Sequence, residues 1–283
     1  MLSKLIIEEA VSRALLEDAP WGDITSETLI PADSTAVAQL VARDGGVMAG
    51  AQVFAASFTL VEPSVGVEIH ITDGETFTPG QILATVTGPA RAVLTGERVG
   101  LNFVQRMSGI ATHTAQYVAA IAGTPAKIVD TRKTTPGLRP FEKHAVVCGG
   151  GHNHRYSLSD AVMAKDNHLA ILTRGGKDLT TELKRVKSQL GHTTHLEVEV
   201  DRLDQIPPVL AAGVDTIMLD NFSLQDLKEG VALIGGRCFI EASGGVNLTT
   251  VRAIAETGVD VISIGALTHQ IHSLDLGLDI TIS

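Results

Sequence analysis

The chain has 283 residues, a formal net charge of −10, and 44% hydrophobic against 19% charged residues. This length accommodates one large domain or two ordinary ones, and the composition is typical of a globular protein and excludes a disordered one. The acidic balance argues against a nucleic-acid-binding surface. Two cysteines, Cys148 and Cys238, are too few for a disulfide framework and predict reduced thiols. The sequence shows no signal peptide and no run of about 18 apolar residues, so we expect a soluble, cytoplasmic protein that does not contact a membrane.

The first 90 residues predict a helix followed by a β-rich module. Residues 4–17 place apolar side chains at helical spacing, and the segments AVAQLVAR, VGVEIHIT and QILATVTG have strand patterns between turns. The stretch DGETFTPGQILATVTG resembles the biotinyl and lipoyl carriers. A carrier needs a lysine for its prosthetic group, and none occurs between Arg43 and Arg91. We therefore expect a structural β module and no carrier or scaffold function.

After a helical stretch over 91–122, short apolar runs alternate with helical segments. The runs are KIVDTRK, DAVMAKDNH, HLEVEV, TIMLDN, CFIEASGG and VISIGAL. Apolar strands alternating with helices predict a parallel sheet covered by helices, and six such units favour a closed or nearly closed β/α barrel. The absence of a GxGxxG motif argues against a dinucleotide-binding fold. The final segment SLDLGLDITIS alternates like an edge strand, which we expect to return to the N-terminal β module.

The ends of these predicted strands carry cations first, acids in the middle and glycines last. In a β/α barrel the active site lies at the carboxyl ends of the strands. Arginine and lysine bind carboxylates, two acids can hold Mg²⁺ or face a developing positive charge, and glycine turns offer N–H groups to phosphate. We therefore expect a site for one multi-anionic small molecule and one phosphorylated, magnesium-bound partner. The residues, in chain order, are Arg132, Lys133, Lys165, Asp166, His168, Glu197, Glu199, Asp220, Asn221, Ser243, Gly244, Gly245 and Gly265.

Three further expectations concern neighbouring residues. Glu197 and Glu199 are expected to point one into the barrel and one towards the helices. Cys148 has no basic partner nearby in the sequence, so we do not expect it to be a nucleophile. His152 and His154 are two residues apart without further ligands, so we do not expect a metal site there.

Several motifs closely resemble those of the quinolinate phosphoribosyltransferase family. They are GERVGLNFVQRMSGIAT, DTRKTTPGLR, GGGHNHR, KDNH, LEVEV, LDNF, EASGGV and ISIGALTH, in this order between residues 96 and 269. The resemblance implies an α/β protein with an N-terminal α/β sandwich over 1–112, on which the tail 271–283 packs, and an open seven-stranded β/α barrel over 113–270. It also implies a pentosyltransferase of de novo NAD biosynthesis. This enzyme joins quinolinate to phosphoribosyl pyrophosphate with Mg²⁺ and no organic cofactor, giving nicotinate mononucleotide, pyrophosphate and CO₂.

The resemblance also implies a role for individual residues. Around the quinolinate carboxylates we expect the TRK, HR and KDNH residues Thr131, Arg132, Lys133, His154, Arg155 and Lys165. Glu199 and Asp220 are expected to face the ribose and to hold Mg²⁺ through water, and with Lys133 and Lys165 they are the expected catalytic residues. The 5′-phosphate is expected at Ser243, Gly244, Gly245, Gly265 and Ala266. Arg98 of the GER motif is expected to reach the neighbouring subunit's site, which implies a homodimer and leaves larger assemblies open.

Two departures from the family pattern and two alternatives accompany this hypothesis. His144 stands where the family has tyrosine, and Ala164 stands where a branched aliphatic residue is usual. Neither change removes a charged ligand. The main alternative is a molybdenum-transport-associated relative with a different acceptor, against which the retained Lys165 argues. A metal-dependent barrel aldolase or lyase is favoured only if Lys165 forms a Schiff base.

Overall fold

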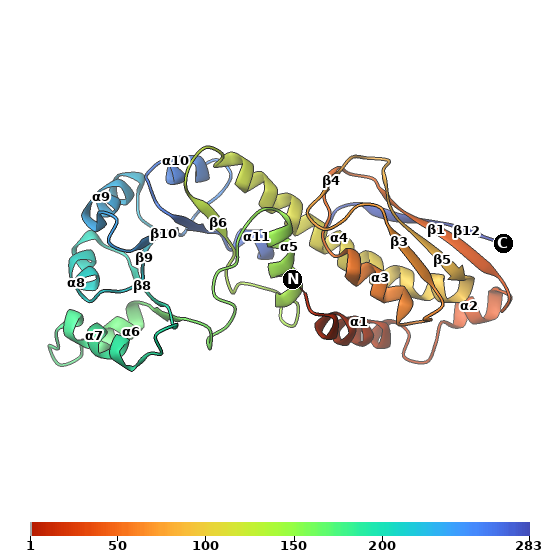
Figure 1. Cartoon of the computed structure of the whole chain (residues 1–283), viewed down its shortest axis with the longest axis horizontal. Coiled ribbons are helices and arrows are strands. Elements are labelled where there is room, and N and C mark those ends of the chain that lie inside the picture. Colours follow the sequence, from red (N-terminus) through yellow and green to blue (C-terminus); the bar gives the residue numbers. More distant parts are fainter. Residues whose placement is uncertain (1) are drawn as a thin grey trace. The chain divides into compact units, whose positions relative to one another are not determined.

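The structure, a computed structural model, describes residues 2–283, and the chain divides into two compact units (Figure 1). Unit 1 consists of the chain up to Ala115 together with Thr134–Gly150 and Leu267–Ser283. Unit 2 consists of Gln116–Lys133 and Gly151–Ala266. Within the described residues, no helix has both the length and the apolar character that a membrane span requires.

Unit 1 contains a four-stranded antiparallel sheet in the order β12-β1-β5-β3. Its strands are β1 (Thr35–Ala42), β3 (Gly66–Ile69), β5 (Ile82–Pro89) and β12 (Leu276–Ile282), and β2 (Gly46–Val47) pairs separately with β4 (Thr76–Phe77). The side chains of β1 alternate between exposed and buried along its first half, as one covered face of a sheet requires. The C-terminal segment that we expected to be an edge strand forms β12, which pairs with β1 over seven residues.

The helices of unit 1 bury their apolar side chains in a core shared with this sheet. Phe54 and Phe58 of α3 meet edge to face, with ring centroids 4.9 Å apart, in one cluster with Leu40 and Leu83 of the sheet. The carboxylate of Asp23 accepts from the backbone N–H groups of Thr25 and Ser26 and so begins α2. The helices are α1 (Lys4–Asp18), α2 (Ile24–Leu29), α3 (Ala51–Thr59), α4 (Ala90–Ala120), α5 (Arg139–Cys148) and α11 (Ala266–His269); α4 continues into unit 2, and α11 begins in it.

Unit 2 contains a parallel sheet of six strands in the order β6-β11-β10-β9-β8-β7. A single parallel bridge between Val129 and His152 adds a further segment beside β6. The strand order ends at β6 and β7, so the barrel is open. The predicted α/β class is confirmed, with an N-terminal sheet domain and a parallel β/α unit. The strands are β6 (Lys127–Val129), β7 (Val162–Ala164), β8 (Leu196–Val200), β9 (Thr216–Asp220), β10 (Phe239–Ser243) and β11 (Val261–Ser263).

The helices of unit 2 lie along the outer side of this curved row of strands (Figure 1). Gly230 illustrates how closely they pack. A Cβ atom at this position of α9 would lie 3.0 Å from Leu219 Cδ1, on β9. The apolar residues of the strands pack against the helices on one face of the sheet. The opposite face of the sheet is left for polar side chains. The helices are α6 (Asp166–Leu172), α7 (Leu179–Gln189), α8 (Ile206–Ala211), α9 (Leu224–Ile234) and α10 (Val251–Ala255), and a 3₁₀ turn, η1 (Leu203–Gln205), precedes α8.

Candidate active site

The carboxyl ends of the parallel strands bring most of the predicted residues to one edge of unit 2. All six strands run in the same direction, so the residues at their ends belong to the same edge. Arg132 and Lys133 follow β6, and Lys165 directly follows β7. Glu199 lies in β8, whereas Asp220 and Ser243 end β9 and β10, and Gly265 and Ala266 follow β11. Arg98 lies exposed on α4, in unit 1.

Arg155 links the segment beside β6 to β7 across the open side of the barrel. Its guanidinium donates from Nη1 to the backbone oxygen of Ala161 at 3.0 Å and contacts Met163 Sδ at 3.6 Å. Burial lowers the pKa of Arg155, and the charge of Arg132 lowers it further. Two guanidiniums this close repel each other, and a bound anion relieves that repulsion. Their arrangement favours a ligand with more than one carboxylate.

The TRK turn beside them is stabilised by its own threonine. The hydroxyl of Thr131 accepts from the backbone N–H of Lys133 at 3.0 Å. The side chain of Lys133 is exposed, and that of Arg132 is half-buried. The turn therefore presents two cations of different exposure, and the charge of one of them, Arg132, acts on Arg155.

His154 lies deeper, between two buried glutamates. Its Nε2 is 3.2 Å from Glu197 Oε2 and 3.3 Å from Glu241 Oε2, and the glutamates are 4% and 3% exposed. Its backbone N–H donates to Oδ1 of Asp130, which is fully buried at the end of β6. Sequence spacing alone missed these partners, and the expectation that His154 has no further ligand-type neighbours is wrong. The ring points to the glutamates, which favours a positioning role over direct contact with a substrate carboxylate.

The two glutamates stabilise the protonated form of His154. Burial alone would lower the pKa of His154, but hydrogen bonds to Glu197 and Glu241 outweigh it and raise the pKa to about 10. Burial in turn raises the pKa of Glu197. The backbone N–H of Arg155 donates to His154 Nδ1 at 2.7 Å, so Nε2 is the ring nitrogen that donates to the glutamates.

Glu197 and Glu199 lie on the same face of β8, contrary to our expectation. Side chains of a strand alternate with a period of two, so residues two apart point the same way. Glu197 contacts His154, whereas Glu199 Oε2 lies 2.5 Å from Lys165 Nζ. The apolar residue between them, Val198, is fully buried on the opposite face. One strand thus supplies acids to two neighbouring parts of the site.

The acidic part of the site surrounds a hollow of about 330 Å³. Its carboxylates offer the oxygen ligands that Mg²⁺ prefers, so the donor set fits this ion. Within residues 2–283, however, neither Glu199 nor Asp220 belongs to a group of three ligand-type side chains within reach of one ion. A Mg²⁺ ion here would therefore be held largely through water and substrate oxygens. The lining residues are Asp166, Glu199, Val200, Asp201, Gln205, Asp220 and Asn221.

Asn221 connects the acidic part to the glycine turn after β10. It has a left-handed backbone, with φ of 57°, and its side chain donates to Asp220 Oδ2 at 2.7 Å. Gly244 has φ of 91°, and a Cβ atom there would lie 2.1 Å from Asn221 Oδ1. Only glycine fits this position, because both the backbone angle and the space exclude a side chain. Asn221 thereby orients a predicted catalytic carboxylate and packs against the predicted phosphate turn.

Two important residues were not predicted as part of the site. Asp130 precedes the TRK motif, and Glu241 lies two residues before Ser243. Both are charged residues within apolar strand sequences. Burying such a charge is energetically unfavourable unless a partner compensates it. This feature of the sequence could have identified both.

A parallel β/α unit with paired arginines, an acidic hollow and a glycine turn at one edge defines an enzyme for anionic, phosphorylated substrates. The family models for the quinolinate phosphoribosyl transferase N-terminal and C-terminal domains match residues 23–108 and 110–279. The chain therefore belongs to the quinolinate phosphoribosyltransferase family, which confirms the prediction made from its motifs.

Known proteins of this family are similar to the chain over nearly its full length. The chain is 39% identical to the probable nicotinate-nucleotide pyrophosphorylase [carboxylating] of Bacillus subtilis, covering 100% of this chain and 96% of the relative. It is 40% identical to the nicotinate-nucleotide pyrophosphorylase [carboxylating] of Mycobacterium leprae, with 96% of each chain covered. The crystal structure of NadC from Streptococcus pyogenes superposes with a TM-score of 0.95 at 39% identity, covering 100% of this chain and 99% of that one.

Proposed function

We propose that this phosphoribosyltransferase joins quinolinate to phosphoribosyl pyrophosphate and releases pyrophosphate and CO₂, with nicotinate mononucleotide as the product. The observation that carries the proposal is that Arg132 lies near Arg155, so that the charge of Arg132 lowers the pKa of Arg155. Quinolinate has two adjacent carboxylates, and two guanidiniums match them in charge and in hydrogen-bonding geometry. The names of the relatives from Bacillus subtilis and Mycobacterium leprae support the same reaction.

On the acceptor side, Arg132, Arg155 and Lys133 bind and orient quinolinate. The trio around His154 keeps the segment before Arg155 in place through the backbone bonds to Asp130 and to the ring. A fixed acceptor places its ring nitrogen against the ribose, and such orientation can lower a barrier by several kcal/mol. His154 thus acts through Arg155.

On the donor side, Glu199 and Asp220 face the ribose. Mg²⁺, when bound with phosphoribosyl pyrophosphate, would neutralise charge on the departing pyrophosphate. The two carboxylates would help to hold that ion through water, and they stabilise the positive charge that develops on the ribose. The turn at Ser243, Gly244 and Gly245, with Gly265 and Ala266 after the next strand, offers backbone N–H groups to the 5′-phosphate.

The reaction then needs no protein nucleophile. The quinolinate nitrogen attacks C1 of the ribose while the bond from C1 to pyrophosphate breaks. When CO₂ leaves, the electron pair of the carbon–carboxylate bond stays on the ring carbon, where the positive charge of the neighbouring alkylated nitrogen stabilises it, and a proton from solvent adds to that carbon. The amine of Lys165 is engaged in an ion pair with Glu199, whereas Schiff-base formation requires a free amine. The structure therefore favours transfer over aldolase chemistry.

The remaining parts of the proposal concern assembly and location. Arg98 is exposed on α4 and is available to a second copy of the chain. In the proposed homodimer it completes the neighbouring subunit's site. We also propose a cytoplasmic location.

The test is an assay with quinolinate, phosphoribosyl pyrophosphate and Mg²⁺, in which CO₂ and nucleotide are measured together. We expect equal amounts of CO₂ and nicotinate mononucleotide, and no nucleotide when nicotinic acid replaces quinolinate. Nucleotide formation from nicotinic acid, or inertness towards quinolinate, would contradict the proposal. The second result would favour the molybdenum-associated alternative with a different acceptor. Borohydride trapping of a substrate on Lys165 would instead support the aldolase alternative.

A further inference from the structure

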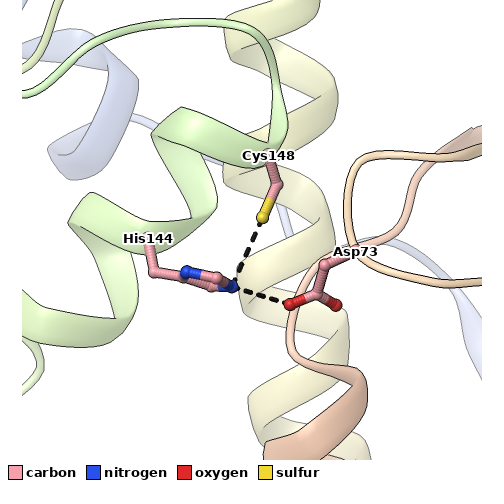
Figure 2. Close-up of side chains that lie close together, drawn as sticks. All are labelled: Asp73, His144 and Cys148. Atoms are coloured by element: carbon pink, nitrogen blue, oxygen red, sulfur yellow. Dashed lines mark hydrogen bonds and ion pairs between the residues drawn. The ribbon is translucent and has the colours of Figure 1, made fainter. Parts of the chain in front are cut away.

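Unit 1 contains a second cluster of reactive side chains, formed by Asp73, His144 and Cys148 (Figure 2). The Nε2 atom of His144 lies 2.7 Å from Asp73 Oδ2 and 3.4 Å from Cys148 Sγ. One ligand atom from each residue lies within 4.8 Å of the other two. All three side chains are partly accessible to solvent. The cluster shares no residue with the candidate active site.

The local structure holds these side chains in place. His144 and Cys148 are four residues apart on α5 and so lie on the same face of the helix. This spacing corrects the expectation that Cys148 has no basic partner nearby. Asp73 comes from the loop between β3 and β4, and its other oxygen, Oδ1, accepts from the backbone N–H groups of Gly50 and Ala51 at 2.8 and 2.9 Å. The carboxylate is thus oriented by one oxygen and presents the other to His144.

The geometry does not fit a cysteine–histidine–aspartate relay for nucleophilic catalysis. In such a relay the nucleophile bonds to one ring nitrogen and the carboxylate to the other. Here the thiol and the carboxylate both approach Nε2, as Figure 2 shows. A single proton on Nε2 can serve only one of them at a time. Three ligand atoms that converge on one point are better suited to a shared ion.

We propose that Asp73, His144 and Cys148 bind a divalent transition-metal ion of the Zn²⁺ type, with water as the fourth ligand. Thiolate, imidazole and carboxylate are the three ligand types that Zn²⁺ uses, at about 2.3, 2.0 and 2.1 Å. At a tetrahedral centre such atoms stand about 3.3–3.7 Å apart. The 3.4 Å separation of Sγ and Nε2 already fits, and the 2.7 Å separation of Nε2 and Oδ2 needs to widen by about half an ångström. The thiol releases its proton to solvent when it coordinates the ion.

Within unit 1, the ion ties α5 to the loop between β3 and β4. The two already approach closely, because a Cβ atom at Gly74, next to Asp73, would lie 3.6 Å from the backbone oxygen of Cys148. α5 also carries Glu142, whose buried carboxylate bonds to Arg106 of α4. The ion therefore braces a helix that is already held by one buried ion pair, and its role is structural.

Titration of the purified protein with Co²⁺ tests this proposal, because a thiolate ligand gives a cobalt charge-transfer absorption band that carboxylates alone do not. We expect the band to saturate at one equivalent in the wild type and in Cys238→Ser, the matched control. It should be absent in Cys148→Ser. His144→Gln and Asp73→Asn should each weaken binding by at least about tenfold, since even changes behind a metal ligand cost 10–100-fold.

A thermal measurement separates metal binding from misfolding. Zn²⁺ should raise the melting temperature of the wild type and of Cys238→Ser, whereas it should leave that of folded Cys148→Ser unchanged. The proposal is overturned if the wild type shows no thiolate band, or if the band and the thermal shift survive in Cys148→Ser. Cobalt bound by the acids of unit 2 gives no thiolate band, so it cannot imitate the expected result.

Discussion

The two sides of the parallel sheet's active edge manage charge in opposite ways. On the acceptor side, Arg132 lies close enough to Arg155 to lower its pKa. On the donor side, an acid is paired with a cation, since Glu199 forms an ion pair of 2.5 Å with Lys165, which the family resemblance assigns to the quinolinate carboxylates. The first arrangement gains from any bound anion, whereas the second keeps an acid oriented before a substrate arrives. We therefore expect the arginines to determine the affinity for quinolinate and the acids to determine the rate of turnover.

The two histidine clusters show a similar contrast. His154 lies between two carboxylates that are 3–4% exposed, and hydrogen bonds to them raise its pKa. His144 lies between a carboxylate and a thiol, and its cluster is partly accessible. The buried cluster around His154 is therefore suited to a structural role, whereas the accessible cluster with a thiol is a candidate metal site.

The largest effect should come from the acids of the donor side. Glu199→Gln and Asp220→Asn should each lower kcat by about 10²–10³-fold, because removing one group that stabilises transition-state charge typically costs that much. Steady-state assays with both substrates at saturation measure it. Glu256→Gln, on the surface of unit 2, is the control and should keep wild-type kcat. Near-normal turnover in both variants would remove these acids from the chemistry.

A smaller effect should follow from filling the space at Gly244. In Gly244→Ala the Cβ atom would meet Asn221 and the left-handed backbone would be strained, so the free energy of unfolding should fall by about 1–3 kcal/mol. Displacement of Asn221 also frees Asp220, so KM for phosphoribosyl pyrophosphate should rise more than KM for quinolinate. Gly245→Ala, where a Cβ atom meets nothing within 4 Å, separates the two causes because it keeps only the backbone strain. Equal unfolding free energies for wild type and Gly244→Ala would contradict the contact with Asn221.

The smallest effect should be the pH dependence of the trio. The pKa of His154 is raised from 6.5 to about 10, so its contribution to stability is complete below pH 6.5 and is lost as pH rises through about 10. The free energy of unfolding should decline over this range by at most about 1.4 kcal/mol for each pH unit. Glu241→Gln removes one of the two carboxylates and should flatten the decline. Urea denaturation at several pH values measures the free energy of unfolding of both proteins, and identical pH dependence would count against the effect of the glutamates on His154.

Periodicity and motif spacing predicted much of the fold and the edge that carries the site. The apolar runs form the parallel strands. Arg132, Lys165 and Asp220 lie at or next to strand ends, as expected. Strand order and closure depend on pairing between distant segments, so the strand pattern alone left a closed or a nearly closed barrel possible, and only the family resemblance implied the open barrel that is found. The seventh parallel segment is only the bridge at His152.

The clusters around the two histidines could not be predicted from local spacing. Asp73 and His144 are 71 residues apart in the sequence, and the partners of His154 come from two different strands. Only folding brings them together. A charged residue inside an apolar strand, as at Glu241, indicates that a partner exists without identifying it.

The central claim is that the paired arginines recognise the dicarboxylate acceptor. Calorimetric titration of Arg132→Ala with quinolinate and, separately, with phosphoribosyl pyrophosphate and Mg²⁺ tests it most directly. Arg185→Ala, at an exposed ion pair on α7, is the matched control. We predict that Arg132→Ala loses about 10–100-fold in affinity for quinolinate, as expected for a lost charge-assisted hydrogen bond, and keeps its affinity for the donor. Equal losses for both substrates would contradict the claim.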